Sequence, residues 1–104
     1  MKIAMYYTRP FETGGVEKTM YARGKYLSKQ GHDITFVYAS NDSPLDMLEK
    51  WSTVGNVKHI DICKDEIFDW CIYDAVYNLK KVKVRKNNYI QVINACLVDS
   101  NEYY

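Results

Sequence analysis

The chain has 104 residues, of which 47% are hydrophobic and 26% charged, and its formal net charge is +1. This length and apolar content are typical of one globular domain with its own core, and they exclude a disordered or low-complexity chain. The near-zero charge argues against a nucleic-acid-binding protein, which is usually clearly basic.

A strand, a loop and a helix are predicted over the first thirty residues. Residues 3–7 form an apolar run long enough for a buried strand. Residues 8–15 are predicted to form a loop, and residues 16–30 follow a helical pattern that ends before Gly31, a residue type common after helices. Tyr26 is expected beside the apolar face of this helix. That face consists of Val16, Met20, Gly24 and Leu27.

Another strand, helix and strand follow. Residues 34–39 are rich in β-branched and aromatic side chains and predict a second buried strand. Ser43 and Pro44 are suited to the N-cap and first position of a helix that runs to about Trp51. Residues 57–62 alternate apolar with polar and predict a third strand, at an edge of the sheet.

Two further strands are expected over residues 69–73 and 89–95. Between them, residues 78–88 allow two interpretations. The Lys-Val-Lys-Val-Arg alternation favours a strand, whereas length and position favour a short helix or loop. Strands that alternate with helices imply a parallel sheet. The predicted fold is therefore α/β, a Rossmann-like three-layer sandwich with a mostly parallel sheet.

The loop after the first strand is the segment where binding chemistry is expected. In open parallel sheets, ligands bind at the carboxyl ends of the strands, where the strand order reverses. Two glycines at the start of a helix allow close backbone approach, and the free N–H groups there favour an anion. A phosphate or carboxylate is thus expected near Gly14, Gly15 and Val16. A tight turn without a ligand is the alternative.

The segment GGVEKT also resembles the GGVGKT core of deviant Walker-A ATPases, with Lys18 and Thr19 as phosphate and magnesium ligands. Two departures weaken this alternative. Glu17 replaces the glycine that lets the loop wrap the phosphates, and a carboxylate there would repel them. Thr13 stands where the deviant motif has a lysine.

A longer stretch, residues 1–40, resembles the start of family-4 retaining glycosyltransferases, which have the two-domain GT-B fold. The matching features are the first strand, the loop with GGVE, a helix that ends in LxxxGHD, and the second strand. Two later segments also fit the family pattern in the right order. These are Phe68-Asp69-Trp70-Cys71-Ile72 and Tyr89-Ile90-Gln91-Val92-Ile93-Asn94-Ala95.

The resemblance implies transfer of a sugar from a nucleotide sugar to a carbohydrate or lipid-linked acceptor, with retention. It implies that Gly14 and Gly15 approach the donor diphosphate, with Val16 and Glu17 in the adjoining helical turn. Glu17 is as well explained as a surface residue that complements the helix dipole. The family often has His where this chain has Asn94, which can contact a sugar hydroxyl but cannot act as an acid or base. A plain strand-end hydrogen bond is the alternative for Asn94.

The resemblance covers only the N-terminal, acceptor-side half of such an enzyme, here residues 1–104. The C-terminal half, with most nucleotide-sugar contacts and a Glu-x₇-Glu motif, is absent, so the chain is expected to be a fragment that is inactive alone. No catalytic residue, metal or cofactor is assigned to it. A stand-alone binding module, which would use the Gly14-Gly15 loop or a sheet edge, is the alternative from a different class.

Histidines and carboxylates give weaker signals. His32 is expected in a turn at the opposite end of the sheet, and His59 on the surface of an edge strand. The acidic stretch is expected to be a solvated face. It consists of Asp61, Asp65, Glu66, Asp69 and Asp74.

A basic run follows, and it suits either a solvated loop or peripheral contact with an anionic membrane. Its members are Lys80, Lys81, Lys83, Arg85 and Lys86. Cys63, Cys71 and Cys96 are an odd number without a CxxC pair, so neither a disulfide framework nor a zinc site is indicated. Buried thiols in a reducing cytoplasm are expected, with membrane contact at the inner face.

Overall fold

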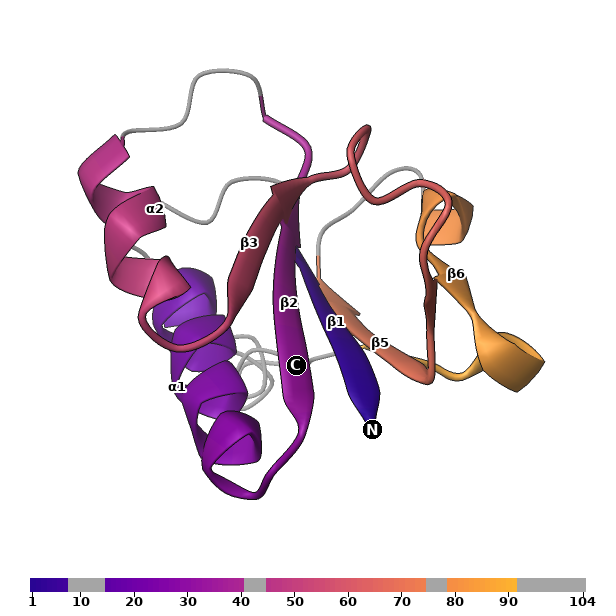
Figure 1. Cartoon of the computed structure of the whole chain (residues 1–104), viewed down its shortest axis with the longest axis horizontal. Coiled ribbons are helices and arrows are strands. Elements are labelled where there is room, and N and C mark those ends of the chain that lie inside the picture. Colours follow the sequence, from indigo (N-terminus) through magenta and orange to yellow (C-terminus); the bar gives the residue numbers. More distant parts are fainter. Residues whose placement is uncertain (8–14, 41–44, 75–78, 92–104) are drawn as a thin grey trace, which may run out of the picture.

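The computed structural model of the chain describes residues 1–7, 15–40, 45–74 and 79–91. Figure 1 shows the arrangement of its elements. In chain order they are β1 (Lys2–Tyr7), α1 (Gly15–Lys29), β2 (Asp33–Tyr38), α2 (Leu45–Ser52), β3 (Asn56–His59), β4 (Ile67–Phe68), β5 (Trp70–Asp74), the 3₁₀ helix η1 (Leu79–Lys81), β6 (Lys83–Val84), the 3₁₀ helix η2 (Arg85–Asn87) and β7 (Tyr89–Gln91).

A five-stranded sheet with the order β3-β2-β1-β5-β7 forms the centre of the fold, and all of its neighbouring strands are parallel. The predicted parallel α/β architecture is therefore confirmed. β3 lies at an edge, as expected, but it ends at His59, earlier than predicted. Ser43 and Pro44 lie outside the described residues, and so does the predicted strand beyond Gln91.

Helix α1 ends as its sequence predicts. Gly31 has φ +93°, a left-handed conformation that glycine adopts without steric cost. Its amide donates to the carbonyl of Ser28 at 3.0 Å, and the next amide, of His32, donates to the carbonyl of Leu27 at 3.2 Å. These two bonds satisfy carbonyl groups that the end of the helix would otherwise leave free.

Among the side chains that the structure describes, the apolar face of α1 differs from the prediction at one position. Tyr26 is 64% exposed, whereas Tyr21 packs against the core. Each helical residue advances by about 100°, so Tyr26 lies about 120° from Met20 and points away from the sheet. Gly24 does face the sheet, so closely that an added Cβ would lie 2.4 Å from Cζ of Phe36.

Both α-helices cover the same face of the sheet (Figure 1). The core on this face is aromatic. The rings of Phe36 and Trp51 meet edge to face with centroids 4.6 Å apart, and Tyr21 lies against both. The remaining buried members are Ile3, Met5, Met20 and Ile34.

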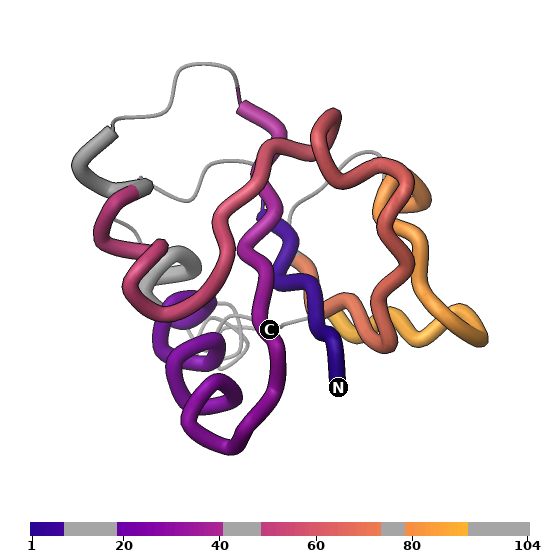
Figure 2. Tube along the Cα trace, viewed as in Figure 1, coloured from indigo at the N-terminus to yellow at the C-terminus, as the bar shows by residue number. Residues whose placement is uncertain are grey.

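Within the described part of the chain, no α-helix covers the opposite face of the sheet. Residues 60–69, which connect β3 to β5, pass over this face and form only the short strand β4, which the sequence did not predict (Figure 2). β4 pairs in parallel with β6, so residues 79–88, the described part of this segment, combine both interpretations, a strand flanked by 3₁₀ turns. The core beneath them includes Tyr6, Val37, Phe68 and Val82, each at most 2% exposed.

The reversal of strand order explains why the two layers lie on opposite faces. From β1 the chain moves outward to β2 and then β3, and it returns past β1 to β5 and β7. Right-handed crossovers that run in opposite directions across a sheet lie on opposite faces. The structure is thus a sandwich with a helical layer, a parallel sheet and a layer of short strands and turns.

Candidate functional site

The carboxyl edge of the sheet is the candidate site, because the strand order reverses there between β1 and β5. The last residues of these two strands, Tyr7 and Asp74, are register partners. The ends of these two strands therefore lie side by side at this edge. The loop expected to carry the binding chemistry begins directly after Tyr7.

The predicted site residues fall partly within the described structure. Gly15, Val16 and Glu17 form the first turn of α1, whose backbone N–H groups have no partner within the helix. Their position agrees with the expectation of a helix N-terminus after the central strand. Gly14 and Asn94 lie outside the described residues, so their roles stay predictions.

The expectation that His59 is a surface residue is wrong, since only 16% of its side chain is exposed. Its Nε2 lies 3.2 Å from the carbonyl oxygen of Ala39, and its Nδ1 lies 3.2 Å from the amide nitrogen of Asp61. The Asp61 amide can only donate, so Nδ1 accepts and Nε2 donates to Ala39. Both nitrogens bind backbone, and His59 joins the ends of β2 and β3 without offering a free acid or base.

His32 lies at the other end of the sheet, in the turn between α1 and β2, as predicted. Its Nδ1 is 3.1 Å from the amino-terminal nitrogen of Met1. The amide of the following residue, Asp33, donates to the carbonyl of Met1 at 2.9 Å. These contacts join the start of β1 to the start of β2, which is a structural role remote from the carboxyl edge.

The acidic stretch is not a uniformly solvated face. Glu66 is held between the ammonium groups of Lys2 and Lys58, each at 3.1 Å. Burial raises the pKa of Glu66, but hydrogen bonds and charge from the two lysines outweigh it and hold the pKa below its ordinary value of 4.5. The carboxylate of Asp69 accepts from the amide of Lys2 at 2.8 Å and lies 3.4 Å from Nε of Arg85. Asp61 and Asp65 are exposed as predicted.

The basic run is exposed at each of its cationic residues, while Val82 between them is buried in the core. Lys80 lies 4.9 Å from the ring centroid of Tyr89, whose hydroxyl donates to the carbonyl of Val82 at 2.6 Å. The run is therefore anchored to the sheet through alternate residues and presents its charges to solvent. Either a solvated face or contact with an anionic surface is compatible with this arrangement.

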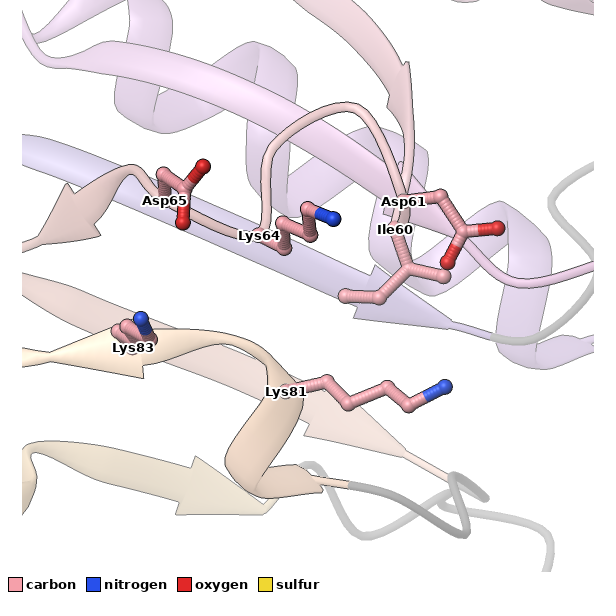
Figure 3. Close-up of a pocket in the computed structure, with 6 residues that line it drawn as sticks. All are labelled: Ile60, Asp61, Lys64, Asp65, Lys81 and Lys83. Carbon is pink, nitrogen blue, oxygen red and sulfur yellow. The ribbon is translucent and has the colours of Figure 1, made fainter.

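A cavity of about 350 Å³ lies between the two crossover segments of the non-helical face (Figure 3). The segment after β3 contributes one lysine, two aspartates and Ile60, and the segment from η1 to β6 contributes two lysines. Lys64, Lys81 and Lys83 are the lysines. Sequence alone does not single out Lys64, because its proximity to the basic run depends on the pairing of β4 with β6.

Cys63 and Cys71 are buried with free thiols, as expected, and Cys96 lies outside the described residues. Among the described residues, no group of three or more His, Cys, Asp or Glu side chains could hold a metal ion. No helix within the described ranges is long and apolar enough to cross a membrane. Comparison with family models, curated proteins and solved structures finds no match to this chain.

Proposed function

We propose that this chain is the acceptor-side half of a retaining glycosyltransferase that transfers a sugar from a nucleotide sugar to a carbohydrate or lipid-linked acceptor. One observation carries the proposal. The last three residues of GGVE, the segment that resembles the family, form the first turn of α1, which follows the central strand β1 in a parallel sheet whose strand order reverses beside β1. Sheets of this kind bind ligands at that point.

The chemistry of sugar transfer suits such a site. The leaving group is a nucleoside diphosphate, on which negative charge increases as the sugar departs. The N–H groups and dipole of the first turn of α1, at Gly15 and Val16, would stabilise that charge without a metal ion. The absence of a side chain at Gly14 and Gly15 would let the diphosphate approach the backbone. Asn94 would donate to or accept from a sugar hydroxyl.

The proposal also explains why the chain alone should be inactive. In the family that it resembles, most contacts to the nucleotide sugar come from a second Rossmann domain, and transfer requires a closed cleft between the two. A lipid-linked acceptor would place the protein at the cytoplasmic face of a membrane. The exposed basic run would then be oriented toward anionic headgroups.

The reading frame downstream of codon 104 provides the first test. A second Rossmann domain with a Glu-x₇-Glu motif would support the proposal. A frame without such a domain would contradict it. A protein partner that binds the chain tightly would then favour a stand-alone binding module.

Calorimetry and activity assays on the purified chain provide the second test. We expect no sugar transfer at ordinary enzymatic rates and no ATP hydrolysis. ATP hydrolysis that is lost in Lys18→Ala but retained in Lys25→Ala would contradict the glycosyltransferase and favour the Walker-type ATPase. The matched control lies on the same helix, away from its first turn.

A further inference from the structure

The cavity between the two crossovers has the composition of an anion site. Three lysines line it from two facing segments, and Figure 3 shows Lys64 on one segment and Lys81 and Lys83 on the other. Within the described part of the chain, none of the three ammonium groups forms an ion pair. They differ in this from Lys2 and Lys58, whose charges Glu66 compensates.

The two aspartates of the cavity do not neutralise these lysines. The carboxylate of Asp61 lies 3.5 Å from Nδ1 of His59, the nitrogen that accepts from the Asp61 amide, and the Asp61 side chain is 76% exposed. Asp65 is also exposed and has no ion-pair partner among the described residues. With three lysines and two aspartates, the cavity has a net charge of one positive.

The cavity also has an apolar wall. Ile60 is 4% exposed and belongs to the core that contains Tyr6 and Val37. A wall of low dielectric beside like charges concentrates their field within a cleft. An anion that contacts a lysine beside this wall would therefore be screened less than one at a lysine surrounded by solvent.

We propose that this cavity binds a phosphate or phosphate monoester group between Lys64 of one crossover and Lys81 and Lys83 of the other. A phosphate monoester carries close to two negative charges and three terminal oxygens, so it can accept from lysines on both walls. A carboxylate has one charge and two oxygens and would leave part of the cluster uncompensated. The proposal is independent of sugar transfer, and its phosphate titration can fail without contradicting the proposed function, although the vesicle arm below also tests the membrane contact proposed for the basic run.

A second cavity of about 210 Å³ provides a matched control. It is lined by Lys25 and Lys29, which lie four residues apart on α1. Both lysines come from one helix and so from one wall, and phosphate held by them would lack a cation on the opposite side. The same change of charge, Lys to Gln, can therefore be made at both cavities.

The test is a titration of the ¹⁵N-labelled 104-residue chain with inorganic phosphate at constant ionic strength, followed by amide chemical shifts. We expect saturable shifts centred on residues 60–65 and 81–83. Each of K64Q, K81Q and K83Q should weaken binding by about threefold, as expected for one exposed charge contact, while K25Q and K29Q leave it unchanged. Asp65→Asn should tighten binding by about twofold, because it removes a repelling charge.

A second arm distinguishes a free phosphate from a lipid headgroup. The chain is mixed with phosphatidylcholine vesicles that contain or lack phosphatidic acid, and co-sedimentation is measured. Binding that requires phosphatidic acid and is lost in the K64Q/K81Q/K83Q variant would support the site and identify the bound phosphate as that of a lipid headgroup. Unsaturable shifts with phosphate, together with no such vesicle binding, would overturn the proposal. Equal losses in K25Q/K29Q would also overturn it, and unchanged thermal unfolding verifies that each variant is folded.

Discussion

The two faces of the sheet bury similar apolar side chains but are covered in different ways. On the helical face, α1 and α2 satisfy their own backbone hydrogen bonds, so the contacts with the sheet can be almost entirely apolar and aromatic. On the other face, residues 60–69 have no helix and need other partners for their polar groups.

Those partners are specific polar contacts. The β4–β6 ladder pairs some of the backbone, Asp69 binds the amide of Lys2, and Glu66 bridges Lys2 and Lys58. The Nδ2 group of Asn88 donates to the carbonyl of Asp69 at 3.0 Å. The comparison indicates that packing dominates the stability of the helical face, whereas the non-helical face also depends on charge and therefore on pH.

The largest expected effect comes from the aromatic core of the helical face. Phe36→Ala should lower the free energy of unfolding by about 3–5 kcal/mol, because it removes the ring that Trp51, Tyr21 and Gly24 contact. Urea unfolding followed by circular dichroism measures the change. Tyr26→Ala on the exposed side of α1 is the control, with a change within about 0.5 kcal/mol. Similar losses in both variants would contradict the described packing.

A smaller effect is expected where α1 meets the sheet. Gly24→Ala should destabilise the fold by about 1–3 kcal/mol through overpacking, although alanine favours the helix by about 1 kcal/mol. The added Cβ would meet Cζ and Cε1 of Phe36 at 2.4 and 2.6 Å. Combining it with Phe36→Leu should cost less than the sum of the two single changes, as measured by a double-mutant cycle. Additive losses would show that the helix does not approach the sheet so closely.

Thr35 offers a stabilising change on the non-helical face. It alternates with Ile34 and Phe36 along β2, and its buried hydroxyl has no hydrogen-bond partner among the described residues. Thr35→Val keeps the shape and removes the unsatisfied group, so the free energy of unfolding should rise by about 1 kcal/mol. Thermal unfolding measures the shift, and Thr35→Ser, which keeps the hydroxyl and loses a methyl group, should shift it in the opposite direction. A loss of stability in Thr35→Val would mean that the hydroxyl has a partner.

The smallest expected effect concerns the charge of Glu66. Glu66→Gln should lower the free energy of unfolding by about 0.5–1 kcal/mol near neutral pH, since 26% of the carboxylate side chain is exposed and solvent screens both pairs. The pKa of Glu66 is lower in the folded chain than its ordinary 4.5. Its contribution is therefore fully present above about pH 4.5 and is lost as the pH falls through the folded value.

The pH dependence of stability provides the control for the Glu66→Gln prediction. The difference in stability between wild type and Glu66→Gln should shrink as the pH is lowered below 4.5, because the wild-type carboxyl then also becomes neutral. The exposed variant Asp65→Asn should show little difference at either pH. A difference between wild type and Glu66→Gln that does not change with pH would show that packing, and not charge, accounts for the effect.

Features encoded by local sequence were predicted well. Apolar runs identified β1 and β2, and Gly31 marked the end of α1, because burial of a strand and a left-handed turn depend on a few adjacent residues. The edge position of β3 also agreed with its alternating pattern. For the candidate site, the sequence predicted a helix that starts at Val16 after the first strand, one residue later than α1 starts in the structure.

Features that depend on distant pairing were missed. β4 was not predicted, and β6 only as one of two interpretations, because each has two residues and only their mutual pairing makes them strands. His59 was expected at the surface because its contact with Ala39 requires β2 and β3 to be adjacent. Glu66 looked like part of a solvated face, since the lysines that hold it come from β1 and β3. A single sequence contains no local signal for such contacts.

The two buried thiols provide a way to measure how often the layer over the non-helical face opens. Burial, and the charge of the nearby Cys63, raise the pKa of Cys71 to about 12, so almost no reactive thiolate exists while the layer above it is closed. Burial likewise raises the pKa of Cys63. Modification of either cysteine by an alkylating reagent therefore records how often residues 60–69 lift from the sheet, and its rate can be compared with that of global unfolding.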